Sequence, residues 1–355
     1  MYAFFTNIPT PQKVPLLNAL NEALNNRLVV FFFAEEVEKR KGWSHSLKEA
    51  RFDYHFLESR RFDINHPVDP GYIFLPSRLP SMKQFKRIVV SGGISPMEVG
   101  IVLKAMGEGT EFVVWTGAVS LRGAYTFLMP IRYILRKFIY SRARAVVVPN
   151  TLAREHALRM GARRVEIAYT SFDLSKFEWE RKHKGTFLRI LFIGRLVKVK
   201  RIFDLLKAVS SIDNYRLTIV GKGPLEKEIL RAIHELGIDR YTALLGEVPY
   251  EQIPEIYRQH DLLILPSEME VHGFVIMESL LSSTPVISTN MVGARDFVIP
   301  RAIYPVGHIE ELRKRIEWMR NPENRNRAVE YGKRLIREKA TPERWAEVFR
   351  RVLLE

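Results

Sequence analysis

At 355 residues, with 46% hydrophobic and 27% charged side chains, the chain has the size and composition of a globular protein of two domains, which excludes a disordered one. It contains no cysteine, which excludes disulfides and thiolate metal sites and is typical of a reducing cytoplasm or of a hot habitat. The net charge of +15 is spread along the chain, with +8 over residues 1–180, so no basic tail indicates a nucleic-acid partner.

The first half of the chain predicts short strands with helical stretches between several of them. The strand-like runs are YAFFT (2–6), LVVFFF (28–33), KRIVVSGG (86–93), EFVVWTG (111–117) and AVVVP (145–149). All are far shorter than the roughly 20 apolar residues of a membrane helix, and the start lacks signal-peptide features, so we expect a cytoplasmic protein. We interpret residues 1–170 as a doubly wound domain, followed by a charged linker at 171–186.

One stretch of the first half is strongly basic. Between Phe112 and Arg154 the chain has no acidic residue, although a solvated helix face usually mixes both signs. Its basic residues are Arg122, Arg132, Arg136, Lys137, Arg142, Arg144 and Arg154. With aromatic side chains between these cations, residues 122–154 suit a helix on the anionic inner face of a membrane, or one that grips a phosphorylated lipid acceptor. The alternative is an ordinary amphipathic helix on the sheet with a basic outer face.

The second half alternates more regularly. Strands are predicted at 188–194, 215–220, 242–246, 261–266 and 285–289, and helices at about 200–212, 225–236, 250–259 and 274–283. This alternation predicts βαβ units and a parallel sheet, and hence a second doubly wound domain at 187–340. Two such domains facing each other would hold a ligand in the cleft between them. Residues 341–355 predict a final helix, capped by Thr341, which crosses back to the first domain.

The most informative segment of the chain is residues 261–279, where a strand leads through an acidic loop into a helix. Glu270 and His272 lie in the loop, and Gly273 lets the backbone approach a ligand closely. The free N–H groups of the helix start suit a phosphate, and the carboxylates of Glu270 and Glu278 suit the hydroxyls of a sugar and a ribose. The segment therefore predicts a site for a phosphorylated sugar compound.

Two further strand-to-helix turns carry glycine and cations. Gly194 and Arg195 end the strand at 188–194, and Lys200 is expected to lie at the start of the next helix. Cations at this place would neutralise a diphosphate and make it a better leaving group. Gly221 and Gly223 form a second turn with room for a ligand.

The order of these motifs resembles the GT-B glycosyltransferases of family 4 over nearly all of residues 188–299. The matching motifs are GRLVKVK (194–200), GKGP (221–224), Glu270 followed eight residues later by Glu278, and then TPVIST and VGARDFV. The resemblance implies an α/β protein of two Rossmann-like, doubly wound domains facing a cleft. It also implies a retaining, metal-independent transferase without a tightly bound cofactor. Its donor would be a UDP-, GDP- or ADP-linked sugar, and its acceptor a glycan, a lipid-linked molecule or a small molecule.

The resemblance further implies a role for each motif residue. Arg195 and Lys200 would hold the donor diphosphate and Glu270 would contact the transferred sugar, so these three are the expected catalytic residues. Glu278 would bind the ribose hydroxyls, and the departing phosphate would accept the acceptor proton. The other expected donor-binding residues are His272, Gly273, Phe274, Val275, Gly194, Gly221, Gly223 and Val248. No second histidine stands near His272 at ligand spacing, so we expect no metal site.

The acceptor side is less clearly marked, because the histidine that many relatives place after a strand of the first domain is absent near 114–117. Trp115 and Thr116 end a predicted strand and line the acceptor cleft, unless Trp115 is part of the core. Gly93 lies in either a phosphate-facing turn or a plain strand-to-helix turn. Two other functions stay open: a nucleotide-sugar epimerase of the same fold, and a non-catalytic binder of polyanions or lipid surfaces.

Overall fold

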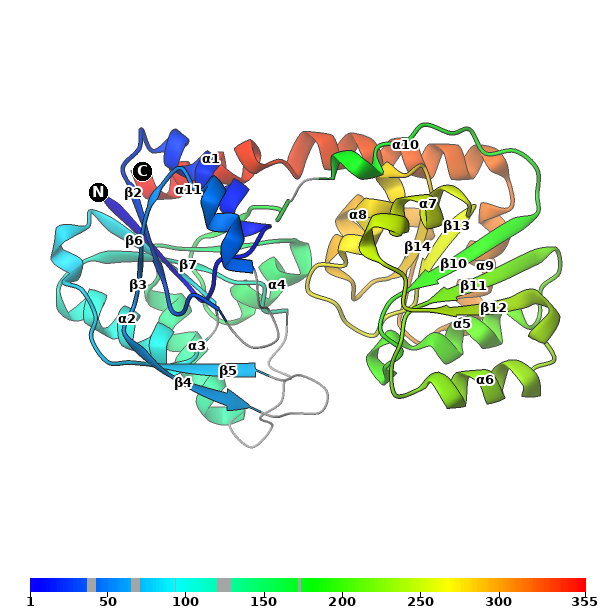
Figure 1. Cartoon of the computed structure of the whole chain (residues 1–355), viewed down its shortest axis with the longest axis horizontal. Helices are drawn as coiled ribbons and strands as arrows, with labels where there is room; N and C mark the ends of the chain where they lie inside the picture. Colours follow the sequence, from blue (N-terminus) through cyan, green and yellow to red (C-terminus); the bar gives the residue numbers. More distant parts are fainter. Residues whose placement is uncertain (37–42, 65–70, 93, 120–128, 172–173) are drawn as a thin grey trace. The chain divides into compact units, whose positions relative to one another are not determined.

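The computed structural model describes residues 1–36, 43–64, 71–92, 94–119, 129–171 and 174–355, and it divides the chain into two compact units. Unit 1 comprises Met1–Phe172 and Lys339–Glu355, and unit 2 comprises Asp173–Glu338. Each unit is built on a parallel sheet with helices packed on it (Figure 1). The predicted α/β class with two parallel-sheet domains is therefore confirmed.

Among the described residues of unit 1, the parallel sheet has the strand order β3-β2-β1-β6-β7-β8-β9. Successive strands of the chain are added on one side of β1 as far as β3, and on its other side from β6 onward, so the strand order reverses between β1 and β6. The strands are β1 (Tyr2–Thr6), β2 (Leu28–Phe32), β3 (Asp53–Phe56), β6 (Arg87–Ser91), β7 (Glu111–Trp115), β8 (Ala145–Val148) and β9 (Val165–Ile167). The helices are α1 (Lys13–Ala23), α2 (Pro96–Gly107), α3 (Met129–Arg142), α4 (Thr151–Arg159) and α11 (Pro342–Leu354). Strands β4 (Ser59–Ile64) and β5 (Gly71–Pro76) form a separate antiparallel pair.

Several strands of unit 1 are absent from the sequence prediction, and their composition explains why. β3 (DYHF) is exposed along its whole length at one edge of the sheet, and β4 (SRRFDI) carries two adjacent arginines. A buried parallel strand is a continuous apolar run, whereas an edge strand need not be apolar on either face. These strands therefore lack the hydrophobic pattern from which the central strands β1, β6 and β7 were predicted.

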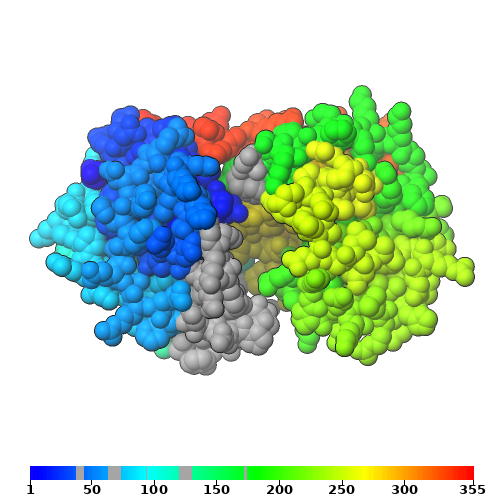
Figure 2. Space-filling view, viewed as in Figure 1, coloured from blue at the N-terminus to red at the C-terminus, as the bar shows by residue number. Residues whose placement is uncertain are grey.

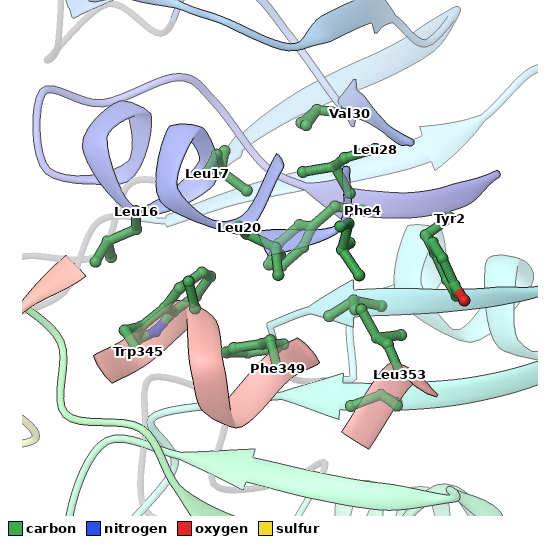
Figure 3. Packing of buried hydrophobic residues seen from close by; sticks show 14 of the residues in the cluster. Tyr2, Phe4, Leu16, Leu17, Leu20, Leu28, Val30, Trp345, Phe349 and Leu353 are labelled. Carbon is green, nitrogen blue, oxygen red and sulfur yellow. The ribbon is translucent and has the colours of Figure 1, made fainter. Parts of the chain in front are cut away.

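The core of unit 1 contains the end of the chain. Trp345 and Phe349 of α11 are fully buried, their rings are 4.2 Å apart, and the Phe349 ring lies 5.9 Å from that of Phe4 in β1. Figure 3 shows these side chains pointing toward Leu16 and Leu20 of α1. Residues from the two ends of the chain thus form one hydrophobic core.

Unit 2 follows the predicted alternation closely, and its sheet has the strand order β12-β11-β10-β13-β14-β15. The strands are β10 (Leu188–Ile193), β11 (Tyr215–Val220), β12 (Thr242–Gly246), β13 (Leu262–Leu265), β14 (Val286–Thr289) and β15 (Ile303–Tyr304). The helices are α5 (Ile202–Val209), α6 (Glu226–Glu235), α7 (Ile253–Arg258), α8 (Phe274–Leu281), α9 (Ile309–Met319) and α10 (Pro322–Lys339). The order reverses between β10 and β13, which are hydrogen-bonded neighbours.

One helix of unit 2 begins later than predicted. Arg201 has a left-handed backbone with φ 49°, which separates a short 3-10 turn at Lys198–Lys200 from α5. A left-handed residue cannot continue an α-helix, so the expected helix from about residue 200 is interrupted there. Lys200 therefore lies in the turn that follows β10 and not in the helix.

The segment before β10 is hydrogen-bonded to the rest of unit 2 at several positions between residues 179 and 185. The backbone N–H of Trp179 donates to Leu281 O at 3.1 Å, and the buried guanidinium of Arg325 donates to Gly185 O at 2.7 Å. His183 is buried and its backbone N–H donates to Asn326 Oδ1 at 2.8 Å. These residues, predicted from their charge to be a linker, therefore form part of the packed surface of unit 2.

Candidate functional site

The two motif segments of unit 2 meet at the reversal of its sheet. β10 is followed by Gly194 and the turn at Lys198–Lys200, and β13 is followed by the loop that ends at Gly273. Because both strands are parallel neighbours, both segments leave the sheet at the same edge. Ligands of open parallel sheets bind at such a reversal of strand order, beyond the carboxyl ends of the strands.

An ion pair joins these two segments. Lys200 Nζ lies 2.7 Å from Oε1 of Glu270, and the two side chains are only 14% and 16% exposed. The hydroxyl of Ser267 donates to the same carboxylate oxygen at 2.5 Å. The backbone N–H of Glu268 donates to Val199 O at 2.7 Å, which ties the two loops together. Two of the three expected catalytic residues are thus in direct contact.

The backbone of Glu270 is held by the segment that follows β14. Its N–H donates to Met291 O at 3.1 Å, and Gly293 N–H donates to Glu270 O at 2.9 Å, which forms an isolated parallel bridge with Val292. Thr289 Oγ1 also donates to Ser267 O at 2.6 Å. The carboxylate therefore projects from a backbone that is hydrogen-bonded on both sides, which suits a group that must keep a fixed position.

Gly273 makes the transition from this loop into α8. Its φ of 75° is left-handed, and a Cβ atom there would lie 2.6 Å from Val292 Cγ1. Both observations require glycine, as the sequence indicates for a close approach of backbone. Phe274 and Val275, two of the expected donor-binding residues, form the first turn of α8, and the dipole of a helix favours anions near its first turn.

His272 stacks on Phe274, with the ring centroids 4.9 Å apart and the planes 7° from parallel. Desolvation lowers the pKa of His272 to about 4, so the imidazole is neutral at pH 7. Within the part of the chain that the structure describes, no three His, Asp or Glu side chains gather as a metal site would require. His272 can therefore offer a neutral ring and a hydrogen bond at this loop.

Glu278 lies on α8 and is almost completely buried, with 6% of its surface exposed. The hydroxyl of Tyr257 donates to its Oε2 at 2.9 Å, and that of Tyr250 donates to its Oε1 at 3.0 Å. Burial raises the pKa of Glu278, while these two hydrogen bonds and the charge of Lys176 oppose the rise. The sequence analysis did not predict the two tyrosines, because nothing in their local pattern indicates a partner 21 or 28 residues away.

The glycines of the GKGP motif allow two turns to touch. A Cβ atom on Gly221 would lie 2.0 Å from Gly194 O, and one on Gly223 would lie 2.4 Å from Leu196 O. Leu196 N–H also donates to Lys222 O at 2.9 Å. The motif thus packs the turn after β11 against the turn after β10, and a role of its glycines in binding the donor stays a prediction.

The remaining expected residues of unit 2 lie along the same edge of the sheet. Arg195 is exposed directly after β10, and Val248 is half-buried two residues after β12. The segment around residue 250, which follows Val248, has several exposed residues and can be found on the surface of unit 2 by its yellow to yellow-green colour (Figure 2). The segments that follow β10, β12 and β13 therefore carry the residues that the motifs predict, apart from Gly221 and Gly223, which follow β11.

The expected acceptor-side residues of unit 1 have mixed surroundings. Trp115 packs on the core cluster, with its ring centroid 5.2 Å from that of Trp345 and 5.6 Å from that of Phe4. Thr116 is buried, and its hydroxyl accepts the N–H of Ala118 at 3.2 Å. Gly93 lies outside the described residues. The contacts of Trp115 favour the core role, and an acceptor-binding role for these residues stays a prediction.

Part of unit 2 is similar to a family of known proteins. Residues 175–335 match the family described as glycosyl transferases group 1. An uncharacterized glycosyltransferase of Methanocaldococcus jannaschii is 30% identical over 112 residues, which are 31% of this chain and 29% of that protein. The N-acetyl-alpha-D-glucosaminyl L-malate synthase of Bacillus anthracis is also 30% identical over 112 residues, with the same shares of both chains. The match thus spans about three tenths of the length of these curated relatives.

Solved structures resemble the chain over its whole length. The crystal structure of HepE of Anabaena in complex with UDP aligns with a TM-score of 0.72 at 15% identity, and covers 99% of both chains. At this identity the likeness shows the fold. Together with the two parallel sheets, it confirms the predicted GT-B class.

Proposed function

We propose that this protein moves a sugar from a nucleotide diphosphate sugar to an acceptor hydroxyl, with retention of configuration, because residues 175–335 match the family of glycosyl transferases group 1. The observation that carries the proposal is the Lys200–Glu270 pair at the sheet reversal of unit 2. The cation of this pair suits the diphosphate of a donor, and the carboxylate 2.7 Å away suits the sugar hydroxyls.

In the proposed reaction, the acceptor oxygen bonds to the anomeric carbon on the face from which the diphosphate leaves. Negative charge grows on the leaving diphosphate as its bond to the sugar breaks, and Lys200 and Arg195 neutralise that charge. Glu270 accepts hydrogen bonds from the sugar and orients it. The proton of the acceptor hydroxyl passes to a departing phosphate oxygen, so that no side chain is required as a strong general base. Metal ions and tightly bound cofactors are not part of this proposal.

The donor site of the proposal extends from Glu270 along α8 to Glu278. The first turn of α8 at Phe274 and Val275 would bind phosphate oxygens, and Glu278 would accept the ribose hydroxyls. Val248, after β12, would lie near the base. UDP is the first nucleotide to test, since HepE was crystallised with it, and GDP and ADP are the others. The acceptor would be a glycan, a lipid-linked molecule or a small molecule.

The first experiment is a calorimetric titration with UDP, GDP, ADP and their common sugar conjugates, without metal and then with Mg²⁺, beside Glu278→Ala. We expect micromolar binding of one nucleotide family and its loss in the variant. Incubation of that donor with candidate acceptors, followed by NMR of the product, then reports the anomeric configuration. Conversion of the donor alone would favour an epimerase, and failure to bind any nucleotide would favour a non-catalytic binder.

We also propose that α3 attaches the protein to the inner face of an anionic membrane. Ile131 and Ile134 are 56% and 65% exposed and lie three residues apart on α3, which places them on one face of the helix. The guanidinium of Arg142 lies 4.0 Å from the ring centroid of Phe138, and Lys137 is exposed beside them. Apolar side chains flanked by cations suit the surface of anionic lipid. Residues 122–128 of the basic stretch lie outside the described residues.

No described helix combines the length and the hydropathy of a membrane span.

A further inference from the structure

The carboxylate of Glu278 is held by two tyrosine hydroxyls that differ greatly in exposure. Tyr257 donates to Oε2 at 2.9 Å and is fully buried, whereas Tyr250 donates to Oε1 at 3.0 Å and is 45% exposed. A carboxylate offers about four acceptor positions, two on each oxygen. The two tyrosines therefore hold one acceptor position on each oxygen of this side chain.

Tyr257 is fixed in its position by the surrounding core. Its ring lies 6.0 Å from that of Phe177, which is also fully buried, and its backbone carbonyl accepts the hydroxyl of Thr284 at 2.7 Å. Its burial in α7 raises the pKa of its hydroxyl well above the usual value, so the group stays a donor. A tyrosine in such surroundings cannot turn away from Glu278 without disrupting the core.

Tyr250 lies in a different environment, in the short turn between β12 and α7. Its ring is covered on one face by Lys176 Nζ, 3.6 Å from the ring centroid, and contacts Phe177 with a centroid distance of 5.9 Å. Nearly half of its surface remains open to solvent. A hydroxyl at such a place can be exchanged for another donor group at little cost, because it can turn toward water.

We propose that Tyr257 positions the Glu278 carboxylate for the donor ribose, whereas Tyr250 occupies on Oε1 the place that a ribose hydroxyl takes in exchange. The inference deepens the proposed function, because it assumes that Glu278 binds ribose. Tyr257 is then a positioning residue, and Tyr250 competes with the donor. Both tyrosines donate a phenol hydroxyl to Glu278. Loss of the Tyr257 hydroxyl nevertheless weakens nucleotide binding, whereas loss of the Tyr250 hydroxyl strengthens it.

A pH effect distinguishes the positioning role from simple packing. The titratable groups of the described residues that face Glu278 are Tyr250, Tyr257 and Lys176, and all three lower its pKa against the effect of burial. Burial raises the pKa of Glu278, and the hydrogen bond from Tyr257 lowers it. Removal of the Tyr257 hydroxyl therefore raises the pKa of Glu278 further. Since a carboxylate accepts ribose hydroxyls better than a carboxylic acid does, nucleotide binding is then lost at a higher pH.

The test compares Tyr257→Phe and Tyr250→Phe with two tyrosines of matched exposure in the same unit. Tyr215 is 3% exposed and Tyr241 is 45% exposed, and both lie near the β12 edge of the sheet. Calorimetry of each full-length variant uses the nucleoside diphosphate that the unmodified protein binds, its 2′-deoxy analogue, and a pH series. Thermal melting shows that each variant is folded.

We expect Tyr250→Phe to bind the nucleotide about threefold more tightly and Tyr257→Phe to bind it about tenfold more weakly, in line with one hydrogen bond each. Tyr257→Phe also moves the acid limb of binding to higher pH and reduces the preference for ribose over 2′-deoxyribose. Tyr215→Phe and Tyr241→Phe change none of these quantities.

Weaker or unchanged binding by Tyr250→Phe overturns the inference, as does a Tyr257→Phe variant whose pH profile matches that of Tyr215→Phe. In both cases the proposed function stands, since the unmodified protein still binds a nucleotide. If the unmodified protein binds none of UDP, GDP and ADP, the proposed function and the inference both fail.

Discussion

Lys200 Nζ lies 2.7 Å from Oε1 of Glu270, across the point at which the strand order of the unit 2 sheet reverses. The two residues are 70 positions apart in the sequence. Their contact gives the site a cation and an anion of fixed separation, both largely shielded from water. In the proposed function, such an arrangement would need little reorganisation when the donor binds, as electrostatic catalysis requires.

The first prediction concerns Glu270. We expect Glu270→Ala to lower kcat by about 100-fold, while the dissociation constant of the nucleotide changes by less than about threefold, because in the proposed function the carboxylate orients the sugar and not the nucleotide. Steady-state kinetics and calorimetry on one preparation provide both numbers. Glu228→Ala, an exposed glutamate on α6, is the matched control and should alter neither. Equal losses of turnover and of nucleotide affinity would contradict this role of Glu270.

The second prediction concerns Asp261, which lies just before β13 and is 7% exposed. Arg189 donates to it from Nε at 2.8 Å and from Nη2 at 3.0 Å, and its carboxylate also faces His183. Although burial opposes the shift, the hydrogen bonds of His183 and Arg189 hold the pKa of Asp261 well below its usual value. A lowered pKa stabilises the fold above the unfolded value of about 3.9 and loses this contribution as the pH falls.

We therefore expect Asp261→Asn to destabilise unit 2 by about 2–4 kcal/mol at pH 7, and the difference from the unmodified protein to shrink below about pH 4. Urea unfolding at several pH values measures both effects. Asp213→Asn, on an exposed turn, should have no effect at any pH. A destabilisation by Asp261→Asn that stays constant down to pH 3 would contradict the assignment.

The third prediction concerns the buried guanidinium of Arg325 on α10. It donates to four backbone carbonyls, at 2.7 Å to Met319 O, 2.9 Å to Arg320 O, 3.3 Å to Lys184 O and 2.7 Å to Gly185 O. Arg325→Met fills the volume but leaves these acceptors without their donor, so we expect a loss of about 2–4 kcal/mol in unfolding free energy. Arg327→Met, at an exposed position of the same helix, should change it by less than about 0.5 kcal/mol. Similar urea midpoints for the two variants would refute the structural role.

The fourth prediction tests the membrane proposal. We expect the unmodified protein to co-float with vesicles that contain about 30% anionic lipid and to be released by salt, because cations of α3 contribute to attachment. A variant with Ile131→Ser and Ile134→Ser should float at least about fivefold less, since two apolar side chains no longer enter the lipid. Leu230→Ser, an equally exposed apolar position on α6, is the control. Equal flotation of all three proteins would exclude α3 as the contact surface.

The central strands of unit 2 could be predicted from the sequence alone. β11 spans 215–220, as predicted, and β10 ends one residue before the predicted boundary. Both are mostly buried parallel strands that are rich in apolar residues, with polar interruptions only at Arg189, Arg216 and Thr218, and each is followed by glycine. The edge strand β3 could not be predicted in this way. Every one of its residues is exposed, so its sequence lacks the run of apolar residues that marks a buried strand.

The candidate site was likewise predicted only in part from the sequence. The motifs identified Lys200, Glu270 and Glu278 by residue type and spacing, and the structure brings the first two into contact. The sequence placed Lys200 in a helix, but the left-handed backbone of Arg201 ends the turn before α5 begins. A single left-handed residue other than glycine leaves no pattern in the surrounding sequence.

The sequence by itself determined the fold class and the segments of the site, because helix and strand periodicity and the glycines of the turns are local properties. The tertiary structure decided which side chains touch. Tyr250 and Tyr257 precede β13 in the sequence, yet they donate to Glu278 on the helix that follows β13, and the ring of Trp345 packs near that of Phe4. Such contacts depend on strand order and on the packing of distant segments, which no local pattern encodes.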